Sequence, residues 1–235
     1  MTAVAANRST MAYATLRVRR VVRLTPRMVR ITLTCANPAA LADAGADQYT
    51  KLFFPLPGQE RPAVPPPVDD AVGGVMGWYQ RYLAMPDEIR PPMRTYTIRA
   101  QRPALGEIDI DFALHPDHAG PASDWASTAA SGDEIGLLCP PRALYSPQPD
   151  PAWQLLVGDE TAIPAIGAIV ESLDAGVTVR AFIEVAGRRN LVRDRGIDKR
   201  AITFTGYWRQ GRTEEDNGRE KVRRAAAGEP LVDED

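Results

Sequence analysis

The chain has 235 residues, of which 28 are basic and 30 acidic, so its formal net charge is −2 and its isoelectric point is about 5.8. A composition of 44% hydrophobic and 25% charged residues is typical of a globular protein and excludes a low-complexity chain. The near-neutral charge argues against nucleic acid as a partner, and no stretch reaches the roughly 18 apolar residues of a membrane span. The two cysteines are too few for a four-cysteine metal site, and the two histidines leave little for a histidine-based one. We therefore expect a cytoplasmic protein without a metal site or a membrane insertion.

The first 140 residues carry the patterns of an antiparallel β domain. Six stretches have the period-two alternation or the composition of strands. They cover residues 14–23, 29–35, 49–54, 94–100, 107–114 and 134–139. A short helix is predicted over 122–130. Residues 55–77 include six prolines and are predicted to form a long surface excursion. Six short strands with turn signals predict a closed barrel in a domain over residues 14–140.

After a proline-rich stretch the pattern becomes that of an α/β domain. An apolar strand, an amphipathic helix and a second strand follow one another, and such a βαβ unit predicts two parallel strands. A last short strand is predicted before the charged tail. These elements cover residues 153–157, 161–173, 177–185 and 201–205. We predict a small α/β domain over 152–213, and a frayed or disordered tail over 214–235.

Three segments carry residues suited to a ligand, and the first is Arg94 to Arg99. Period two places Arg94 and Tyr96 on one face of a strand. A guanidinium beside an aromatic ring suits a ligand with a phosphate and a flat ring, because arginine binds phosphate in a bidentate manner and tyrosine stacks. An edge strand of mixed polarity would show the same pattern.

The second segment lies between a strand that ends at Leu114 and a helix that begins after Gly120. Pro121 suits the first helical position, and Gly120 lets a ligand approach the backbone closely. The free N–H groups of the first turn, with the Ser123 hydroxyl, would form an anion site. Capping alone would also explain this start, and His115 is equally well explained as a structural histidine.

The third segment, Gly158-Asp159-Glu160-Thr161-Ala162, follows the first strand of the βαβ unit. Ligands bind at the carboxyl ends of parallel strands in such folds. The segment is neither a GxGxxG fingerprint nor a Walker A loop. Asp159 or Thr161 acting as an N-cap would equally explain its polar residues.

The order of these three segments resembles that of the siderophore-interacting proteins, flavin-dependent ferric-siderophore reductases within the ferredoxin-reductase superfamily. Other stretches that resemble this family are Lys51-Leu52-Phe53-Phe54-Pro55, Met85-Pro86-Asp87-Glu88 and Gly206-Tyr207-Trp208-Arg209-Gln210-Gly211. The resemblance extends from about Thr15 to Arg212. It implies a six-stranded FAD-binding barrel followed by a shortened, parallel-sheet nicotinamide-binding domain.

The resemblance also implies which residues bind ligands. Arg94 would contact an FAD phosphate, while Tyr96 would pack on the isoalloxazine ring. Thr97 would lie near the flavin N5 edge, which requires a β-bulge or a main-chain contact because pleating points it away from Tyr96. The implied cofactor-binding residues are Arg94, Tyr96, Thr97, Ile98, His115, Gly120, Pro121, Ala122, Ser123, Asp159, Glu160, Thr161, Ala162, Tyr207 and Trp208.

Substrate contacts are implied for two basic residues, Lys51 and Arg209, which would face an anionic ferric siderophore. Lys51 is equally well explained as a solvated strand residue. The arginines of the first hairpin are either a substrate patch or, as we favour, its solvated face. They are Arg17, Arg19, Arg20, Arg23, Arg27 and Arg30.

The implied activity is electron transfer from NADH or NADPH through FAD to a ferric siderophore, which releases Fe(II) for iron assimilation. A flavin converts a hydride into single electrons, and Fe(II) binds hard oxygen ligands less well than Fe(III). No protein nucleophile, acid–base pair or metal ligand is implied.

The sequence departs from the family in the second domain. Residues 152–213 number 62, and one βαβ unit already uses about 30 of them. Only three strands fit, and the family's further strand and helix are missing near Val185 to Arg189. An alternative is therefore a flavin- or siderophore-binding protein without NAD(P)H reductase activity of its own.

Overall fold

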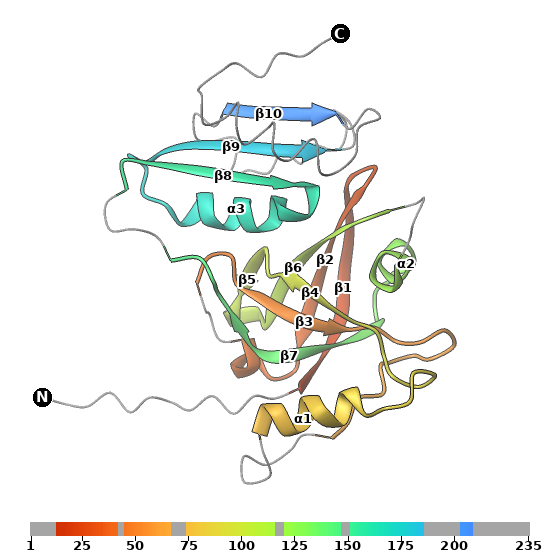
Figure 1. The fold of residues 1–235 in the computed structure, drawn as a ribbon. Coiled ribbons are helices and arrows are strands. Elements are labelled where there is room, and N and C mark those ends of the chain that lie inside the picture. Colours follow the sequence, from red (N-terminus) through yellow and green to blue (C-terminus); the bar gives the residue numbers. More distant parts are fainter. Residues whose placement is uncertain are drawn as a thin grey trace, which may run out of the picture. The chain divides into compact units, whose positions relative to one another are not determined.

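The alternating patterns of the N-terminal half form one antiparallel sheet of seven strands (Figure 1). The structure is a computed structural model that describes residues 13–41, 45–66, 74–115, 120–146, 151–185 and 203–208. The sheet has the order β4-β3-β7-β1-β2-β6-β5. Its strands are β1 (Tyr13–Thr25), β2 (Met28–Cys35), β3 (Tyr49–Phe53), β4 (Met93–Thr97), β5 (Ala100–Arg102), β6 (Glu107–Ala113) and β7 (Glu134–Arg142).

This sheet curls into a barrel-like shape because its two end strands follow each other in the chain. β4 ends at Thr97 and β5 begins at Ala100. Between them, the Ile98 N–H donates to the Gln48 carbonyl at 2.8 Å, and the Arg99 N–H donates to the Asp109 carbonyl at 2.9 Å. The predicted antiparallel barrel-like domain is confirmed. The single strand expected over 94–100 is instead two strands, since residues 98 and 99 bond to opposite sides, and no complete ladder closes the barrel among the described strands.

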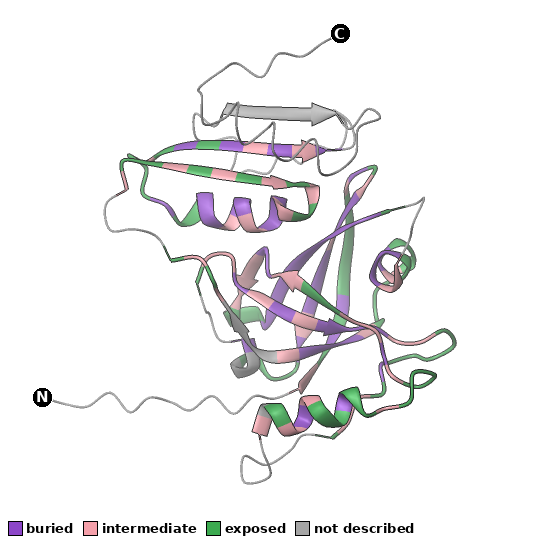
Figure 2. Cartoon of the chain, in the orientation of Figure 1, coloured by how far each residue is buried: buried purple, intermediate pink, exposed green. Residues whose placement is uncertain are grey.

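The core of the sheet comes from the inward positions of each strand. Leu16, Ile31, Ile110 and Phe112 are completely buried (Figure 2). At 25–30 cal/mol for each Å² of apolar surface, such side chains each stabilise the fold by about 1.5–3 kcal/mol. β6 is buried on both faces, because its outward residues lie beneath arginine side chains.

Residues 55–77 only partly match the predicted excursion. Residues 55–66 do form a loop, but α1 (Gly74–Leu83) begins inside the predicted range. The ring centroids of Trp78 and Tyr82 lie 5.5 and 5.3 Å from that of Phe53. The Trp78 indole N–H also donates to the Pro65 carbonyl at 2.9 Å. Burial of these rings against β3 holds both the helix and the loop on the sheet.

The chain folds as two compact units, residues 1–146 and 147–235. The second contains β8 (Trp153–Asp159), a 3₁₀ turn η4 (Glu160–Ala162), α3 (Ile163–Ser172), β9 (Thr178–Val185) and β10 (Thr203–Trp208). β8 and β10 both pair with β9 in parallel, which confirms the predicted βαβ arrangement. The last strand includes Gly206, Tyr207 and Trp208, beyond the predicted 201–205. The tail predicted over 214–235 lies outside the described residues.

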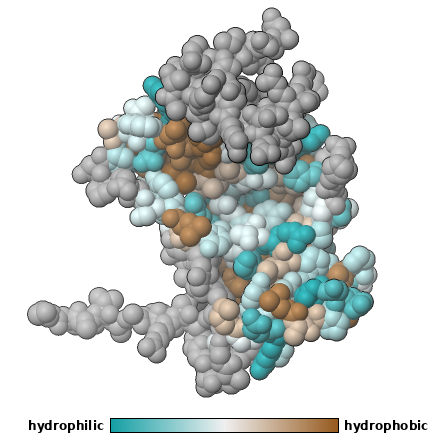
Figure 3. All heavy atoms as spheres, viewed as in Figure 1, coloured by the Kyte–Doolittle hydropathy of each residue, from teal (hydrophilic) through white to brown (hydrophobic). Residues whose placement is uncertain are grey.

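β8 is an edge strand with one apolar face exposed. In the order β10-β9-β8, no described strand pairs with the second edge of β8. Trp153, Leu155 and Val157 lie at alternate positions and are 60%, 42% and 56% exposed. Figure 3 shows apolar residues gathered over β8 and α3. The opposite side of β8 packs against η4 and α3, since a Cβ on Gly158 would overlap that of Ala162.

No helix within the described ranges combines the length and the apolar composition that crossing a membrane requires.

Candidate functional site

β4 presents an exposed cation beside a half-buried ring. Arg94 is exposed, and one of its Nη atoms donates to the Met93 carbonyl at 2.8 Å. Among the described residues no carboxylate pairs with Arg94, so its guanidinium keeps donors for a ligand. Burial raises the pKa of Tyr96 to about 12, against the opposing charge of Arg94. Tyr96 therefore stays a neutral hydrogen-bonding ring at every physiological pH.

The helix α2 (Pro121–Thr128) begins in the way an anion site requires. Gly120 is its N-cap with extended backbone and no side-chain cap, and nothing lies within 4 Å of the position that a Cβ would take there. The N–H groups of Ala122 and Ser123 have no acceptor inside the helix. The buried Ser123 hydroxyl accepts the His115 N–H at 3.0 Å. Because that oxygen already accepts, its own proton remains to be donated.

Four aromatic rings join β4 to α2. Tyr96 lies 4.5 Å from Phe112, measured between ring centroids, and Phe112 lies 5.7 Å from Trp125. Phe54 lies 5.5 Å from Trp125 and completes the cluster. The cluster therefore brings two of the three predicted segments onto one support. Sequence reasoning missed it, although the inward position of Phe112 on a strongly alternating strand was a signal.

Thr97 and Ile98 lie where β4 ends. Ile98 is buried, and the β3–β4 ladder pairs Tyr49 with Thr97 and continues to Phe53 without a shift. The bulge that would turn Thr97 toward a flavin is therefore absent from this ladder. A main-chain contact from Thr97 stays a prediction.

Of the two predicted substrate residues, one is described. Lys51 pairs with Thr95 across β3 and β4, and its ammonium group donates to the Thr95 hydroxyl at 3.4 Å. That weak contact leaves Lys51 able to meet a ligand or solvent. Arg209 lies outside the described residues.

The third segment forms the turn after β8, in the second unit. The Asp159 carboxylate accepts the Thr161 N–H at 2.8 Å and the Thr161 hydroxyl at 2.6 Å, and so caps η4. The side chain of Asp159 therefore caps η4, as the N-cap interpretation of this segment predicted. Asp159 also pairs with Glu184, which pairs with Tyr207, so the turn and the last strand share the carboxyl edge of the sheet. The structure describes only the backbone of Tyr207 and Trp208.

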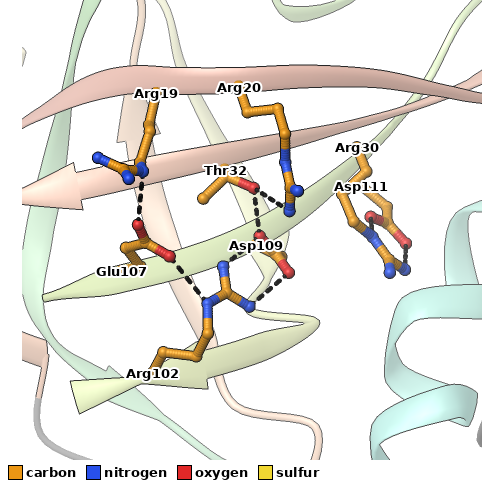
Figure 4. Close-up of polar contacts among 8 residues, drawn as sticks. All are labelled: Arg19, Arg20, Arg30, Thr32, Arg102, Glu107, Asp109 and Asp111. Carbon is orange, nitrogen blue, oxygen red and sulfur yellow. Dashed lines mark hydrogen bonds and ion pairs between the residues drawn. The ribbon is translucent and has the colours of Figure 1, made fainter. Parts of the chain in front are cut away.

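Three of the six arginines of the first hairpin pair with carboxylates, and Figure 4 shows two of these pairs. A register shift in β1 between Val18 and Arg20 gives Arg19 and Arg20 the same outward direction. Arg19 pairs with Glu107 at 2.8 Å, and Arg30 with Asp111 at 2.6 Å. Arg17 likewise pairs with Glu134 at 2.7 Å. These ion pairs agree better with the predicted outer face of the hairpin than with a substrate patch. The face is not only solvated, however, because Arg19 and Arg30 also cover β6.

Comparisons with known proteins point to one family. The model of the siderophore-interacting FAD-binding domain matches residues 17–144, and that of the siderophore-interacting protein matches residues 151–189. The NADPH-dependent ferric-chelate reductase of Escherichia coli is 34% identical over 166 residues, 71% of this chain and 59% of that protein. The ferric vibriobactin reductase of Vibrio cholerae is 31% identical over 160 residues, 67% of this chain and 53% of that protein.

A solved structure, that of a siderophore utilization protein from T. fusca, has a TM-score of 0.72 and 29% identity. The alignment covers 95% of this chain and 78% of that one. The chain spans a little over half the length of the curated relatives it matches.

Proposed function

The chain belongs to the siderophore-interacting protein family, and from that membership we propose that it is a cytoplasmic, FAD-dependent reductase of ferric siderophores with NADH or NADPH as electron donor. Two relatives are named as reductases of iron chelates, and one of them as NADPH-dependent. FAD, when bound, supplies the conversion of a hydride's electron pair into the single electrons that Fe(III) accepts. The protein's own residues would bind FAD, orient it and shield it from water.

The observation that carries this proposal is the start of α2. The N–H groups of Ala122 and Ser123 and the Ser123 proton are three donors beside the open space at Gly120. Such a set of donors fits a pyrophosphate, because a hydrogen bond to a charged acceptor is stronger than one to a neutral acceptor. Arg94 would bind phosphate from β4, and the ring of Tyr96 would pack on the flavin.

In the second unit the turn at Asp159 would line the nicotinamide side. Because Asp159 and Thr161 hold each other, their role would be to fix the backbone of this turn. Glu160 and Ala162 follow in η4, and Tyr207 lies on the same sheet edge in register with Glu184. These residues would shape a site without taking part in proton transfer.

One observation favours the alternative of a flavin- or siderophore-binding protein without NAD(P)H activity. The described part of the second unit has three strands, and the second edge of β8 has no partner among them. A nicotinamide site in a parallel sheet depends on the strands on either side of its crevice.

An anaerobic visible spectrum before and after NADH or NADPH separates the two functions. The reductase is expected to show flavin bands that the nucleotide bleaches and that a ferric siderophore restores. Flavin bands that dithionite bleaches, while neither nucleotide does, would favour the alternative. A colourless protein that takes up no added FAD would contradict the reductase and would leave only the siderophore-binding form of the alternative.

Replacing Arg94 by alanine is expected to weaken FAD binding about tenfold or more, since hydrogen bonds to charged groups contribute roughly 1.5–3 kcal/mol. Riboflavin, which lacks phosphate, should bind the Arg94→Ala variant as it binds the original protein. Titration of protein into each flavin, followed by flavin fluorescence, gives both dissociation constants. Arg81→Ala, at an exposed position on α1, is the control. Equal FAD affinity in Arg94→Ala would remove this residue from the site.

A further inference from the structure

The Tyr145 hydroxyl is buried and has no hydrogen-bond partner, alone in this among the side chains of the described residues. Buried hydroxyls nearly always have a partner, because leaving one unpaired costs the free energy of removing it from water. Burial also raises the pKa of Tyr145, so the group is a neutral donor and acceptor. The described residues of the chain do not supply a partner for this hydroxyl, and a bound ligand with a polar group can supply one.

The backbone at Tyr145 is held firmly by the loop before β3. The Asp47 carboxylate accepts the N–H groups of Leu144 and Tyr145. Asp47 has a φ of +61°, in the left-handed region that aspartate tolerates better than most residues. A strained residue that fixes two neighbouring amides is typical of a functional site, where the surrounding structure maintains the strain. Tyr145 is therefore not part of a freely moving linker.

The sheet places Tyr145 at the end of β4 that the flavin proposal uses. Arg142 pairs with Tyr49, and Tyr49 pairs with Thr97, so these residues form one row across β7, β3 and β4. Tyr145 follows this row by three residues. Asp47, whose carboxylate accepts the Tyr145 N–H, is next to Gln48 in the chain. The Gln48 carbonyl accepts the Ile98 N–H at 2.8 Å. Tyr145 is thus tied to the turn beside Thr97 and Ile98.

The same ladder separates Tyr145 from the phosphate donors. Arg94 pairs with Leu52, three residues along β3 from Tyr49. At about 3.3 Å for each residue of a strand, this separation is roughly 10 Å. A ligand that reaches from Arg94 to the end of β4 therefore presents its phosphate at Arg94 and its flavin portion near Tyr145.

We infer that the Tyr145 hydroxyl forms a hydrogen bond with a polar group on the isoalloxazine or ribityl portion of the bound flavin, the portion that riboflavin and FAD share. This inference rests on the proposed function. It adds a flavin-binding residue that follows β7, outside the three segments that sequence motifs identified.

Tyr145→Phe tests the inference because it removes only the hydroxyl. The variant is expected to bind riboflavin and FAD with dissociation constants that both rise about three- to tenfold, the usual effect of one neutral hydrogen bond. Without flavin, its thermal unfolding temperature should stay the same or rise, since an unpaired buried group has gone. Tyr82→Phe is the matched control, because the Tyr82 hydroxyl donates to the Pro91 carbonyl at 2.7 Å. It should unfold at a lower temperature and bind both flavins normally.

Three results would overturn the inference. Unchanged affinity of Tyr145→Phe for both flavins would show that the hydroxyl has no flavin partner. A loss confined to FAD would place its partner outside the shared portion. Failure of the original protein to bind any flavin would overturn the proposed function as well, which distinguishes that failure from the first two.

Discussion

Phe112→Ala is expected to lower the free energy of unfolding by about 3–5 kcal/mol, the usual cost of deleting a buried aromatic ring. Phe112 is completely buried, and its centroid lies 4.5 Å from Tyr96 and 5.7 Å from Trp125. Its loss leaves a cavity between β4 and α2, so both supports of the proposed flavin site loosen. We therefore expect weaker flavin binding in addition to lower stability, measured by urea unfolding and by flavin titration at a temperature where the variant is folded.

Phe53→Ala separates the two effects of Phe112→Ala. Phe53 is equally buried, but its ring packs against Trp78 and Tyr82 of α1. A similar loss of stability is expected, with flavin affinity retained. If both variants lost flavin affinity equally, the ring cluster would have no specific part in the site.

Asp109→Asn is expected to have the second large effect. It should lower the free energy of unfolding by about 3–5 kcal/mol, because it breaks a buried charge pair. Asp109 is only 5% exposed. Its carboxylate accepts two hydrogen bonds of 2.8 Å from Arg102 and one of 2.7 Å from the Thr32 hydroxyl (Figure 4). Asparagine removes the charge and turns N–H groups toward a guanidinium that is itself only a donor. Chemical unfolding near neutral pH measures the loss.

The same carboxylate makes stability depend on pH. Burial would raise the pKa of Asp109, but the hydrogen bonds from Arg102 and Thr32, with the charges of Arg102 and Arg30, outweigh it and hold the pKa below its usual value. A lowered folded-state pKa stabilises the fold fully above the unfolded value of about 3.9, and the effect is lost as pH falls through the folded value. The difference between the original protein and Asp109→Asn should therefore narrow below about pH 4.

Glu134→Gln is the surface control for this carboxylate. Glu134 pairs with Arg17, whose side chain is 65% exposed, and pairs of this kind contribute less than about 1 kcal/mol. A loss for Glu134→Gln as large as that for Asp109→Asn would mean that burial does not decide the energetics of this network. An unchanged difference between Asp109→Asn and the original protein down to about pH 3 would contradict the lowered pKa of Asp109.

The parts of the fold that the sequence predicted are those with strong local periodicity. Residues 107–114 alternate strictly and form β6, and the pattern over 153–185 predicted the parallel βαβ unit. The division of 94–100 into two strands could not be predicted, because it depends on bonds from Ile98 and Arg99 to segments that the local pattern does not reveal. The prolines of 55–67 concealed the start of α1, although Trp78 and Tyr82 lie one helical turn apart.

The candidate site shows the same division between residues that local motifs indicate and residues whose position depends on distant parts of the chain. Motifs identified Arg94, Tyr96 and the start of α2, since each depends on neighbours in the chain. Tyr145 had no such signal, because its backbone is held by Asp47, almost a hundred residues earlier. The shared direction of Arg19 and Arg20 could not be predicted either, because it depends on a register shift in β1 that only the pairing with β2 reveals.

The edge of β8 that no described strand pairs with has a practical consequence for solubility. Natural proteins protect edge strands with lysine, proline or bulges, and β8 has none of these between Trp153 and Gly158. Among the described strands nothing pairs with that edge, and its exposed apolar side chains favour pairing with the same edge of another molecule. Self-association should therefore grow with protein concentration and compete with refolding, so flavin titrations and unfolding experiments call for dilute samples.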